Sequence, residues 1–573
     1  MKLLKGIGVS PGIAIGKALI KEDIIIEEKQ YSVQDIEQEC MRLTEAKEKG
    51  KRQLQDLYEI TLEKAGKHEA QIFASHTMIL EDEAFIGEVE SKIRSEKVNA
   101  EWALKEVSGH FIKVFEGMDN EYMQERVMDI RDVTQRMQYN LQGIEDNHLL
   151  MMNESAIIIA KDLTPSDTVQ LDTEKVLGFI TEVGGKTSHS AIMARSLEIP
   201  AIAGVDHICS KVQHGDWIVF DGSEGAMYIN PDQATITKYQ EKKAVLEERM
   251  RILSAMKESQ AITVDGVHFE IAGNIGQPAE VDRVVEKGGD GIGLFRTEFI
   301  YMNRKDFPSE EEQFEAYKKV LQKMKEKPVV IRTFDIGGDK ELDYLPFPEE
   351  MNPFLGYRAI RLCLDRVDLF KTQLRAILRA SIYGNAKLMF PMISAVEELR
   401  QSKHILEEVK EGLRNEGIAF DENLQVGMMI ETPSAVVAAD MFAKEVDFFS
   451  IGTNDLIQYT MAVDRLNPHV SHLYSPFNPS VLRSIKRVID EGHKAGIWVG
   501  MCGEAAAEPK LVPLLVGMGL DEFSMNPASI LEVKWMIQQY AKEELQDIVN
   551  EVLELATIDE IEELLKGKMK SFA

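Results

Sequence analysis

One histidine stands at a junction of glycines and hydroxyl groups in the segment GGKTSHSAIM, residues 184–193. The glycines allow a tight turn, and Thr187 or Ser188 can cap a helix that starts at or next to His189. The free N–H groups and the dipole of a helix N-terminus disfavour an imidazolium ion and favour bound anions. A neutral imidazole is a nucleophile, and a phosphoryl group on it would be stabilised there. The alternative is a histidine that only caps or packs, and on position alone this is the commoner role.

A second group of polar side chains follows a series of apolar runs in the C-terminal half of the chain. Its members are Asn274, Arg296, Glu298, Arg332, Asp335, Glu431, Asn454, Asp455, Cys502 and Glu504, with Arg358 and Arg465 in loops close behind. The planar fork of arginine suits phosphate and carboxylate oxygens. Two carboxylates completed by phosphate oxygens and water suit Mg²⁺ rather than zinc. The set predicts a site for a small phosphorylated anion chelated to Mg²⁺. Structural ion pairs are the alternative, which is plausible for any one arginine but not for the whole set.

Cys502, in WVGMCGE, ends one of these runs beside glycines. Most single cysteines are small buried apolar residues. A thiol that faces the same site could instead donate a proton, and we favour this general-acid role.

The apolar runs must position these groups. Eight of them alternate with helical sequence over about 300 residues from about residue 261, which is typical of a (β/α)8 TIM barrel, with a doubly wound open sheet as the alternative. They are HFEIAGNI, GIGLFRTEF, PVVIRTFDIGG, AKLMFPMI, VGMMIETP, FFSIGTND, IWVGMCGE and EFSMNP. In a TIM barrel the carboxyl ends of the strands meet at one mouth, so the polar groups should converge there.

The N-terminal half predicts an α/β domain that is interrupted by a helical insertion. Residues 1–22 and 147–230 contain short β-rich runs, whereas residues 23–146 show the three- and four-residue apolar spacing of helices, as in HEAQIFASHTMILED. Residues 23–145 hold 27 acidic and 16 basic side chains, so the exposed faces of the insertion are acidic. The sequence of residues 231–260 is typical of a charged linker helix, and residues 261–573 are then predicted to form the barrel.

Composition narrows the class of protein. The formal net charge of -30 argues against nucleic acid and anionic membranes as partners. The chain has no apolar run long enough to span a membrane, so we expect a cytoplasmic protein. Its four cysteines form no CxxC pair, which argues against disulfides and a zinc site. It has no P-loop, so no nucleotide-binding motif supplies phosphate.

Several long motifs resemble those of the phosphoenolpyruvate-protein phosphotransferase family, Enzyme I of the bacterial sugar phosphotransferase system. They occur in the family's order and the resemblance covers essentially the whole chain; Phe334, inside RTFDIGGDK, is an apolar difference. The motifs are GGKTSHSAIMARSLEIPAIAG, GIGLFRTEFIYM, IRTFDIGGDKEL, NPFLGYRAIR, GMMIETPSAV, FFSIGTNDLIQYTMAVDR and GMCGEAA.

The resemblance implies that His189 takes the phosphoryl group from phosphoenolpyruvate and passes it to a histidine of the phosphocarrier protein HPr. It implies a swivelling α/β phosphohistidine domain, with Thr168 near His189. It further implies that the acidic helical domain docks HPr and that the barrel forms a homodimer. In the barrel, Cys502 would protonate the enolate. The substrate would be bound by Arg296, Arg332, Arg465 and Asn454, with Arg358 assisting from nearby. Mg²⁺ would be bound by Glu431 and Asp455.

Three rivals remain on sequence alone. A pyruvate phosphate dikinase or phosphoenolpyruvate synthase would add a large ATP-binding domain, for which the insertion of about 120 residues leaves no room. A regulatory scaffold would lack some of the reactive side chains, and none is missing. A barrel enzyme that acts on a phosphorylated metabolite, such as an aldolase, leaves GGKTSH and the insertion unexplained.

Overall fold

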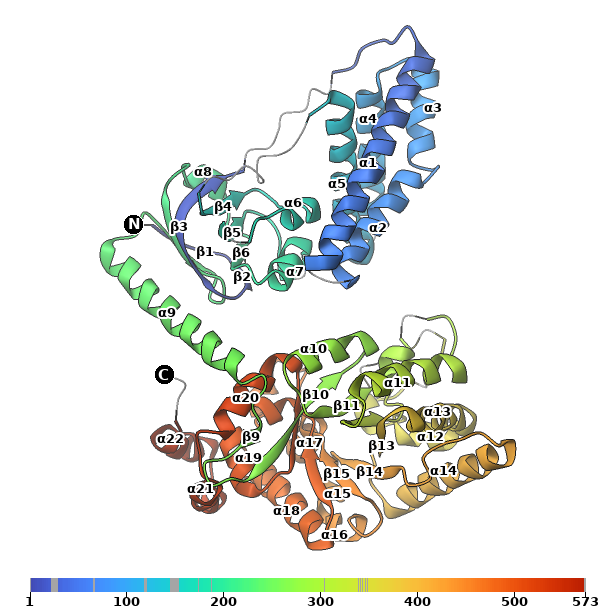
Figure 1. Cartoon of the computed structure of the whole chain (residues 1–573), viewed down its shortest axis with the longest axis vertical. Coiled ribbons are helices and arrows are strands. Elements are labelled where there is room, and N and C mark those ends of the chain that lie inside the picture. The colour runs from blue at the N-terminus through green and yellow to red at the C-terminus, as the bar shows by residue number, and fades with distance from the viewer. Residues whose placement is uncertain are drawn as a thin grey trace. The chain divides into compact units, whose positions relative to one another are not determined.

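The computed structural model describes residues 2–21, 29–64, 67–117, 121–144, 154–173, 175–186, 188–302, 304–338, 340, 342, 344–345, 347 and 349–570. The chain forms two compact units, Met1–Glu248 and Arg249–Ala573. The predicted fold class is confirmed: an α/β unit with an inserted set of helices, and a parallel eight-stranded barrel (Figure 1).

The first unit is built on one eight-stranded sheet in the order β1-β8-β7-β3-β4-β5-β6-β2. Strands from both sides of the insertion share this sheet, since β3 pairs with β4 in parallel and with β7 in antiparallel orientation. All five residues of β4 are buried, which explains its uninterrupted apolar sequence. The strands are β1 (Lys2–Lys5), β2 (Ile7–Ser10), β3 (Ile13–Ile20), β4 (Ala156–Ala160), β5 (Val176–Thr181), β6 (Ala201–Ala203), β7 (Trp217–Asp221) and β8 (Ala226–Ile229).

The insertion consists of long helices with their own apolar core. In Figure 1 these helices lie alongside one another, and α1 packs against α2 and α5. Three shorter helices belong to the sheet: α6 (Pro165–Val169), α7 (His189–Ser196) and α8 (Ile208–Lys211). The inserted helices are α1 (Ile36–Lys64), α2 (Lys67–Glu81), α3 (Ile86–Glu96), α4 (Ala100–Glu116) and α5 (Glu121–Gln142).

The predicted linker helix is α9 (Gln233–Ala255). Among its residues Tyr239 is buried, which matches the expected lack of a wide apolar face. Near the middle of the helix Lys242 forms ion pairs with Asp221 and Glu224 of the first unit, and closer to its C-terminal end Arg249 pairs with Glu532 of the second.

The second unit closes into a barrel, because the parallel series β11-β12-β13-β14-β15-β16-β17-β10 ends on a strand that also pairs with β11. All eight predicted strands are present, and most are shorter than their apolar runs. For example, β11 ends at Arg296 and a 3₁₀ turn follows. The barrel strands are β10 (His268–Ile275), β11 (Gly291–Arg296), β12 (Pro328–Arg332), β13 (Asn385–Phe390), β14 (Gln425–Ile430), β15 (Phe448–Ile451), β16 (Trp498–Met501) and β17 (Glu522–Met525), with β9 (Ala261–Ile262) antiparallel to β10.

Helices surround the strands and share one large apolar core with them. Glycines with positive φ end three of these helices, at Gly417, Gly496 and Gly519, where a side chain would be strained. The helices are α10 (Val281–Glu286), α11 (Glu310–Met324), α12 (Ile360–Asp365), α13 (Val367–Ala380), α14 (Val396–Glu416), α15 (Pro433–Val437), α16 (Ala439–Phe442), α17 (Thr453–Met461), α18 (Pro479–Ala495), α19 (Val512–Met518), α20 (Ile530–Ile537), α21 (Lys542–Glu554) and α22 (Ile558–Lys568).

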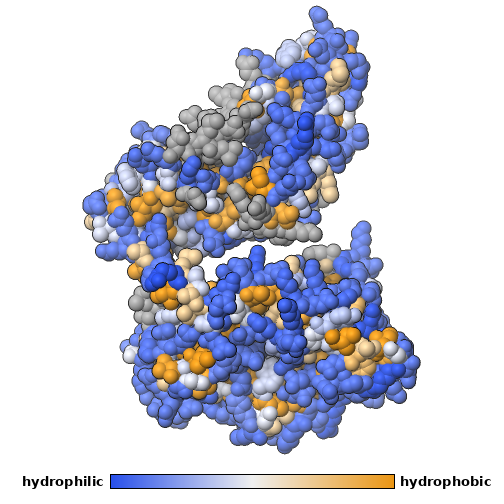
Figure 2. Space-filling view, viewed as in Figure 1, coloured by the Kyte–Doolittle hydropathy of each residue, from blue (hydrophilic) through white to orange (hydrophobic). Residues whose placement is uncertain are grey.

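Hydrophilic residues predominate on the face of the molecule drawn in Figure 2. Within the described part of the chain, every helix is too short or too polar to cross a membrane.

Candidate active site

The predicted barrel residues converge on one cavity of about 500 Å³ at the carboxyl ends of the strands. The strands place them directly: Arg296 and Arg332 are the last residues of β11 and β12, Glu431 follows β14, and Cys502 follows β16. Asn274 does not line the cavity but donates to the carbonyl oxygen of Cys502 at 2.9 Å. The predicted residues that line the cavity are Arg296, Glu298, Arg332, Asp335, Arg358, Glu431, Asn454, Asp455, Arg465, Cys502 and Glu504. Because these positions are spread over about 200 residues of sequence, closure of the barrel is what brings them together.

A buried ion-pair network holds Arg332. Its Nη2 lies 2.5 Å from Glu298 Oε1 and 3.0 Å from Asp335 Oδ2, and all three side chains are almost inaccessible. Burial by itself raises the pKa of a carboxyl group, yet Arg332 and the other nearby cations hold the pKa of Glu298 below, and that of Asp335 well below, the ordinary value. Both carboxylates are therefore ionised and fix the guanidinium toward the cavity.

Arg358 is held from a second direction. Its Nη2 lies 3.0 Å from Asp335 Oδ1 and 3.3 Å from Asp455 Oδ2. The loop that precedes it packs so closely that a Cβ on Gly337, whose φ is +114°, would lie 2.5 Å from Arg358 Cβ. Arg358 thus connects the β12 network with Asp455 in the first turn of α17.

Glu431 and Asp455 form the carboxylate pair that the sequence predicted. Glu431 Oε1 accepts a 2.6 Å hydrogen bond from the N–H of Met392, and burial together with the neighbouring charge of Asp455 raises the pKa of Glu431 to about 8. Asp455 Oδ1 is buried without a hydrogen-bond partner among the described residues. An orphan oxygen and two mutually repelling carboxylates fit a divalent cation, which would neutralise both.

The described residues contain no group of three or more histidine, cysteine, aspartate or glutamate side chains arranged around one metal position. Mg²⁺ commonly binds through one or two carboxylates and takes its other ligands from substrate phosphate and water. The pair Glu431 and Asp455 fits this pattern.

Cys502 is 2% exposed, and its Sγ lies 3.9 Å from the carbonyl oxygen of Ile451, to which the thiol donates. Burial raises the pKa of the Cys502 thiol to about 11. The thiol therefore keeps its proton at neutral pH, as a proton donor requires and a thiolate nucleophile does not.

Three residues of the site were not singled out from the sequence. Lys340 Nζ lies 2.7 Å from Glu298 Oε1, the Tyr459 hydroxyl accepts a hydrogen bond from Arg358 Nη1 at 3.2 Å, and the Tyr474 hydroxyl donates to the carbonyl oxygen of Asn454 at 3.2 Å. Lys340 lies within the motif IRTFDIGGDKEL, so its position was a usable signal. Tyr459 lies within the motif FFSIGTNDLIQYTMAVDR and had the same signal, whereas Tyr474 lies outside the quoted motifs and had none.

The predicted histidine belongs to the first unit. As predicted, it lies at a helix N-terminus: His189 is the first residue of α7, and the Ser188 hydroxyl caps this helix by accepting from the N–H of Ala191 at 3.4 Å. The side chain of His189 and all of Thr187 lie outside the described residues. Thr168 is fully buried in α6, which packs against α7.

Comparison with known proteins covers every part of the chain described above. The family described as "PEP-utilising enzyme, PEP-binding domain" matches residues 251–542, its "mobile domain" counterpart matches 152–225, and the "N-terminal" counterpart matches 5–126. Three relatives carry the name phosphoenolpyruvate-protein phosphotransferase. The protein of Bacillus sp. (strain S) is 51% identical over 99% of this chain and 98% of its own length. That of Bacillus subtilis (strain 168) is 51% identical over the full length of both, and that of Staphylococcus aureus (strain MSSA476) is 49% identical over 99% of this chain and 100% of its own.

Proposed function

Because this chain belongs to the phosphoenolpyruvate-protein phosphotransferase family, we propose that His189 takes the phosphoryl group of phosphoenolpyruvate and passes it to a histidine of the phosphocarrier protein HPr, with release of pyruvate. This would be the first step of sugar uptake by the phosphotransferase system. The observation that supports the proposal most strongly is the barrel cavity, where four arginines meet the carboxylate pair Glu431 and Asp455 and a protonated thiol.

The arginines of the cavity differ in how firmly they are held. Arg332 and Arg358 are preorganised by ion pairs with buried carboxylates, whereas the side chain of Arg296 makes no hydrogen bond or ion pair with any described residue and can turn toward an anion. Arg296, Arg332 and Arg465 would hold the phosphate, with Asn454 as a polar contact and Arg358 assisting. Preformed cations need no rearrangement when the substrate binds.

The proposed reaction breaks the bond between phosphorus and the enol oxygen and forms a bond between phosphorus and an imidazole nitrogen of His189. The enolate that is left takes a proton at carbon from the Cys502 thiol and becomes pyruvate, and the thiolate recovers a proton from water. Glu431 and Asp455 would hold Mg²⁺, which supplies charge neutralisation at the phosphate.

Thr168 is suited to orient the histidine. Its hydroxyl already donates to the carbonyl oxygen of Thr164 at 2.9 Å, so its lone pairs remain to accept an N–H. An imidazole that donates one N–H to Thr168 keeps its other nitrogen unprotonated, and this nitrogen would attack phosphorus.

The histidine and the cavity belong to different compact units, so one histidine can serve both the donor and a partner protein if the α/β domain swivels. The linker helix α9 is the segment across which this movement would occur. The excess of acidic side chains in the insertion supports it as the dock for a basic face of HPr. Homodimerisation through the barrel remains a prediction of the family resemblance, and a cytoplasmic location remains a prediction of the sequence composition.

The proposal is tested by incubating the purified chain with labelled phosphoenolpyruvate and Mg²⁺, beside labelled ATP, excess EDTA and a His189→Ala control. We expect acid-labile, base-stable label from phosphoenolpyruvate alone, absent from the control and the EDTA sample, and drained by added HPr. Labelling from ATP would place the chain with the dikinases. A folded chain that takes label from neither donor would be a scaffold, contrary to the proposal.

A further inference from the structure

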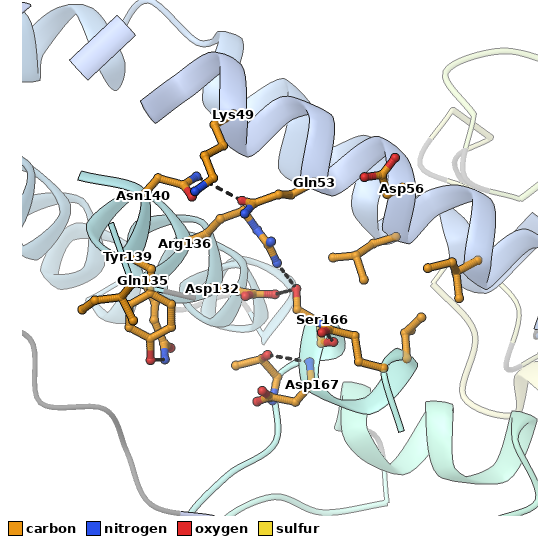
Figure 3. Close-up of a pocket in the computed structure, with 16 residues that line it drawn as sticks. Lys49, Gln53, Asp56, Asp132, Gln135, Arg136, Tyr139, Asn140, Ser166 and Asp167 are labelled. Carbon is orange, nitrogen blue, oxygen red and sulfur yellow. Dashed lines mark hydrogen bonds between the residues drawn. The ribbon is translucent and has the colours of Figure 1, made fainter. Parts of the chain in front are cut away.

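A hydrogen-bonded contact joins the helical insertion to α6, the short helix that carries Thr168 (Figure 3). Ser166 Oγ donates to Asp132 Oδ2 at 2.8 Å and accepts from Arg136 Nη2 at 2.6 Å. Figure 3 shows both α5 side chains directed at this serine. Ser166 and Asp132 are about 95% buried, so water does not replace either hydrogen bond easily.

The space around this contact is hollow. A cavity of about 510 Å³ lies between α1, α5 and α6, bounded among others by Gln53, Leu57, Tyr139 and Gln170. Close packing therefore fixes this side of α6 only in part. Val169 also borders this cavity and joins the apolar core of the insertion, together with Met193 of α7. The orientation of α6 thus depends on its packing against α7 and the insertion, on the ion pair between Asp167 and Lys21, and on the hydrogen bonds of Ser166.

A buried histidine of α2 lies next to the same contact. His76 is completely buried, with Nε2 3.1 Å from Asp129 Oδ1 and Nδ1 3.6 Å from Asp132 Oδ2. His76 belongs to the motif HEAQIFASHTMILED, to which the proposed phosphoryl transfer gives no role. His76 is hydrogen-bonded to Asp129 and lies beside Asp132, the carboxylate to which Ser166 donates.

The rest of α6 is held rigid, so a displacement of Ser166 also displaces Thr168. Thr164 and Asp167 form a capping box at its start, and the Asp167 carboxylate lies 2.8 Å from Lys21 Nζ. Thr168 is two residues from Ser166 on this five-residue helix. A tilt of α6 would move both residues together.

We propose that Ser166, clamped between Asp132 and Arg136, is a positioning residue that sets the orientation of Thr168 and through it the tautomer of the phosphoryl-accepting histidine. The inference rests on the proposed function of Thr168 and His189 and adds a residue on which that function depends. The insertion then does more than offer a docking surface, because α5 also aligns the acceptor.

The test compares full-length Ser166→Ala with Ser196→Ala. Ser196 is a matched control because its hydroxyl also joins the two parts, by donating to Glu69 Oε1 at 2.9 Å, but from the far end of α7. We expect Ser166→Ala to slow single-turnover labelling from phosphoenolpyruvate about tenfold, because misorientation of a reacting group lowers the rate while substrate binding in the barrel is untouched. The KM for phosphoenolpyruvate should stay the same, and Ser196→Ala should behave as the parent chain.

A spectroscopic readout separates this inference from the function on which it rests. In ¹⁵N-histidine-labelled protein, with the signal assigned by difference from a His189→Gln chain, we expect one tautomer in the parent and a mixture in Ser166→Ala. If Ser166→Ala unfolds, the isosteric pair Ser166→Thr and Ser166→Val replaces it, and only the threonine should keep the single tautomer. An unchanged tautomer and rate in Ser166→Ala, or an equal loss in Ser196→Ala, would overturn the inference. A parent chain that takes no label refutes the proposed function, while the tautomer comparison still decides the role of Ser166.

Discussion

Glu522 is a buried acid in the barrel that the proposed reaction does not use. It is 4% exposed and its Oε2 has no hydrogen-bond partner among the described residues. Two glycines make room for it, since a Cβ on Gly293 or Gly500 would lie 1.9 or 2.2 Å from its carboxyl oxygens. Burial, and to a lesser degree the charge of Glu270, raise the pKa of Glu522 to about 8, and Lys387 opposes this shift. We therefore expect Glu522 to be protonated at neutral pH and ionised in mild alkali.

The sign and size of the consequence follow from linkage. The pKa of Glu522 is raised from 4.5 when the chain is unfolded to about 8 when it is folded. The folded chain thus binds one more proton between these values, and the free energy of unfolding falls by roughly 1.4 kcal/mol per pH unit as the pH rises through this window. The loss levels off above the folded pKa. Between pH 6 and pH 8 it amounts to about 2 kcal/mol. Glu522→Gln keeps the shape of the protonated acid and cannot ionise, so it should lack this component.

The assay is urea unfolding of the full chain at pH 6, 7 and 8, with and without Glu522→Gln. A Trp102→Phe/Trp217→Phe background leaves the fluorescence to Trp498 and Trp535 of the barrel, and Trp498 stacks on Phe448 with ring centroids 4.4 Å apart. The parent should lose about 2 kcal/mol more than the glutamine variant over this range. A difference between the two chains that stays constant with pH would show that Glu522 ionises normally and would refute the reasoning.

Three further outcomes are expected. Arg358→Met should lower the free energy of unfolding by about 3–5 kcal/mol, because it leaves Asp335 and Asp455 buried without their shared cation; urea unfolding at pH 7 measures this, and a loss below about 1 kcal/mol would contradict the buried network. Cys502→Ser should slow pyruvate release about a hundredfold at an unchanged Kd for phosphoenolpyruvate; a coupled assay for pyruvate that finds the parent rate would exclude the thiol as proton donor. Gly500→Ala should destabilise the barrel by about 1–3 kcal/mol through overpacking against Glu522; a Tm equal to that of the parent would mean that the carboxyl group moves aside freely.

Much of the architecture could be predicted because it follows from local patterns. Apolar runs predicted the eight barrel strands, and helical spacing predicted the insertion between the strands of the first unit. Both patterns reflect which residues close in sequence are buried. The helix start at His189 was predictable for the same reason, since a hydroxyl cap and glycines act within one turn. The residues at strand ends could be named because a parallel barrel places such ends at one mouth.

What the sequence determined by itself, then, is the type and order of the elements and the kinds of side chain at their ends. Only the tertiary structure decided which of those side chains touch. Lys340 and Tyr474 join the site through loops whose paths no periodicity encodes. The raised pKa of Glu431 depends on its burial and on the charge of Asp455, 24 residues away, which barrel closure brings beside it. The Ser166 contact also depends on the tertiary structure, because a direct hydrogen bond joins α6 to α5 beside the cavity. Burial and electrostatic coupling are sums over neighbours in space, and those neighbours exist only once the sheets have closed.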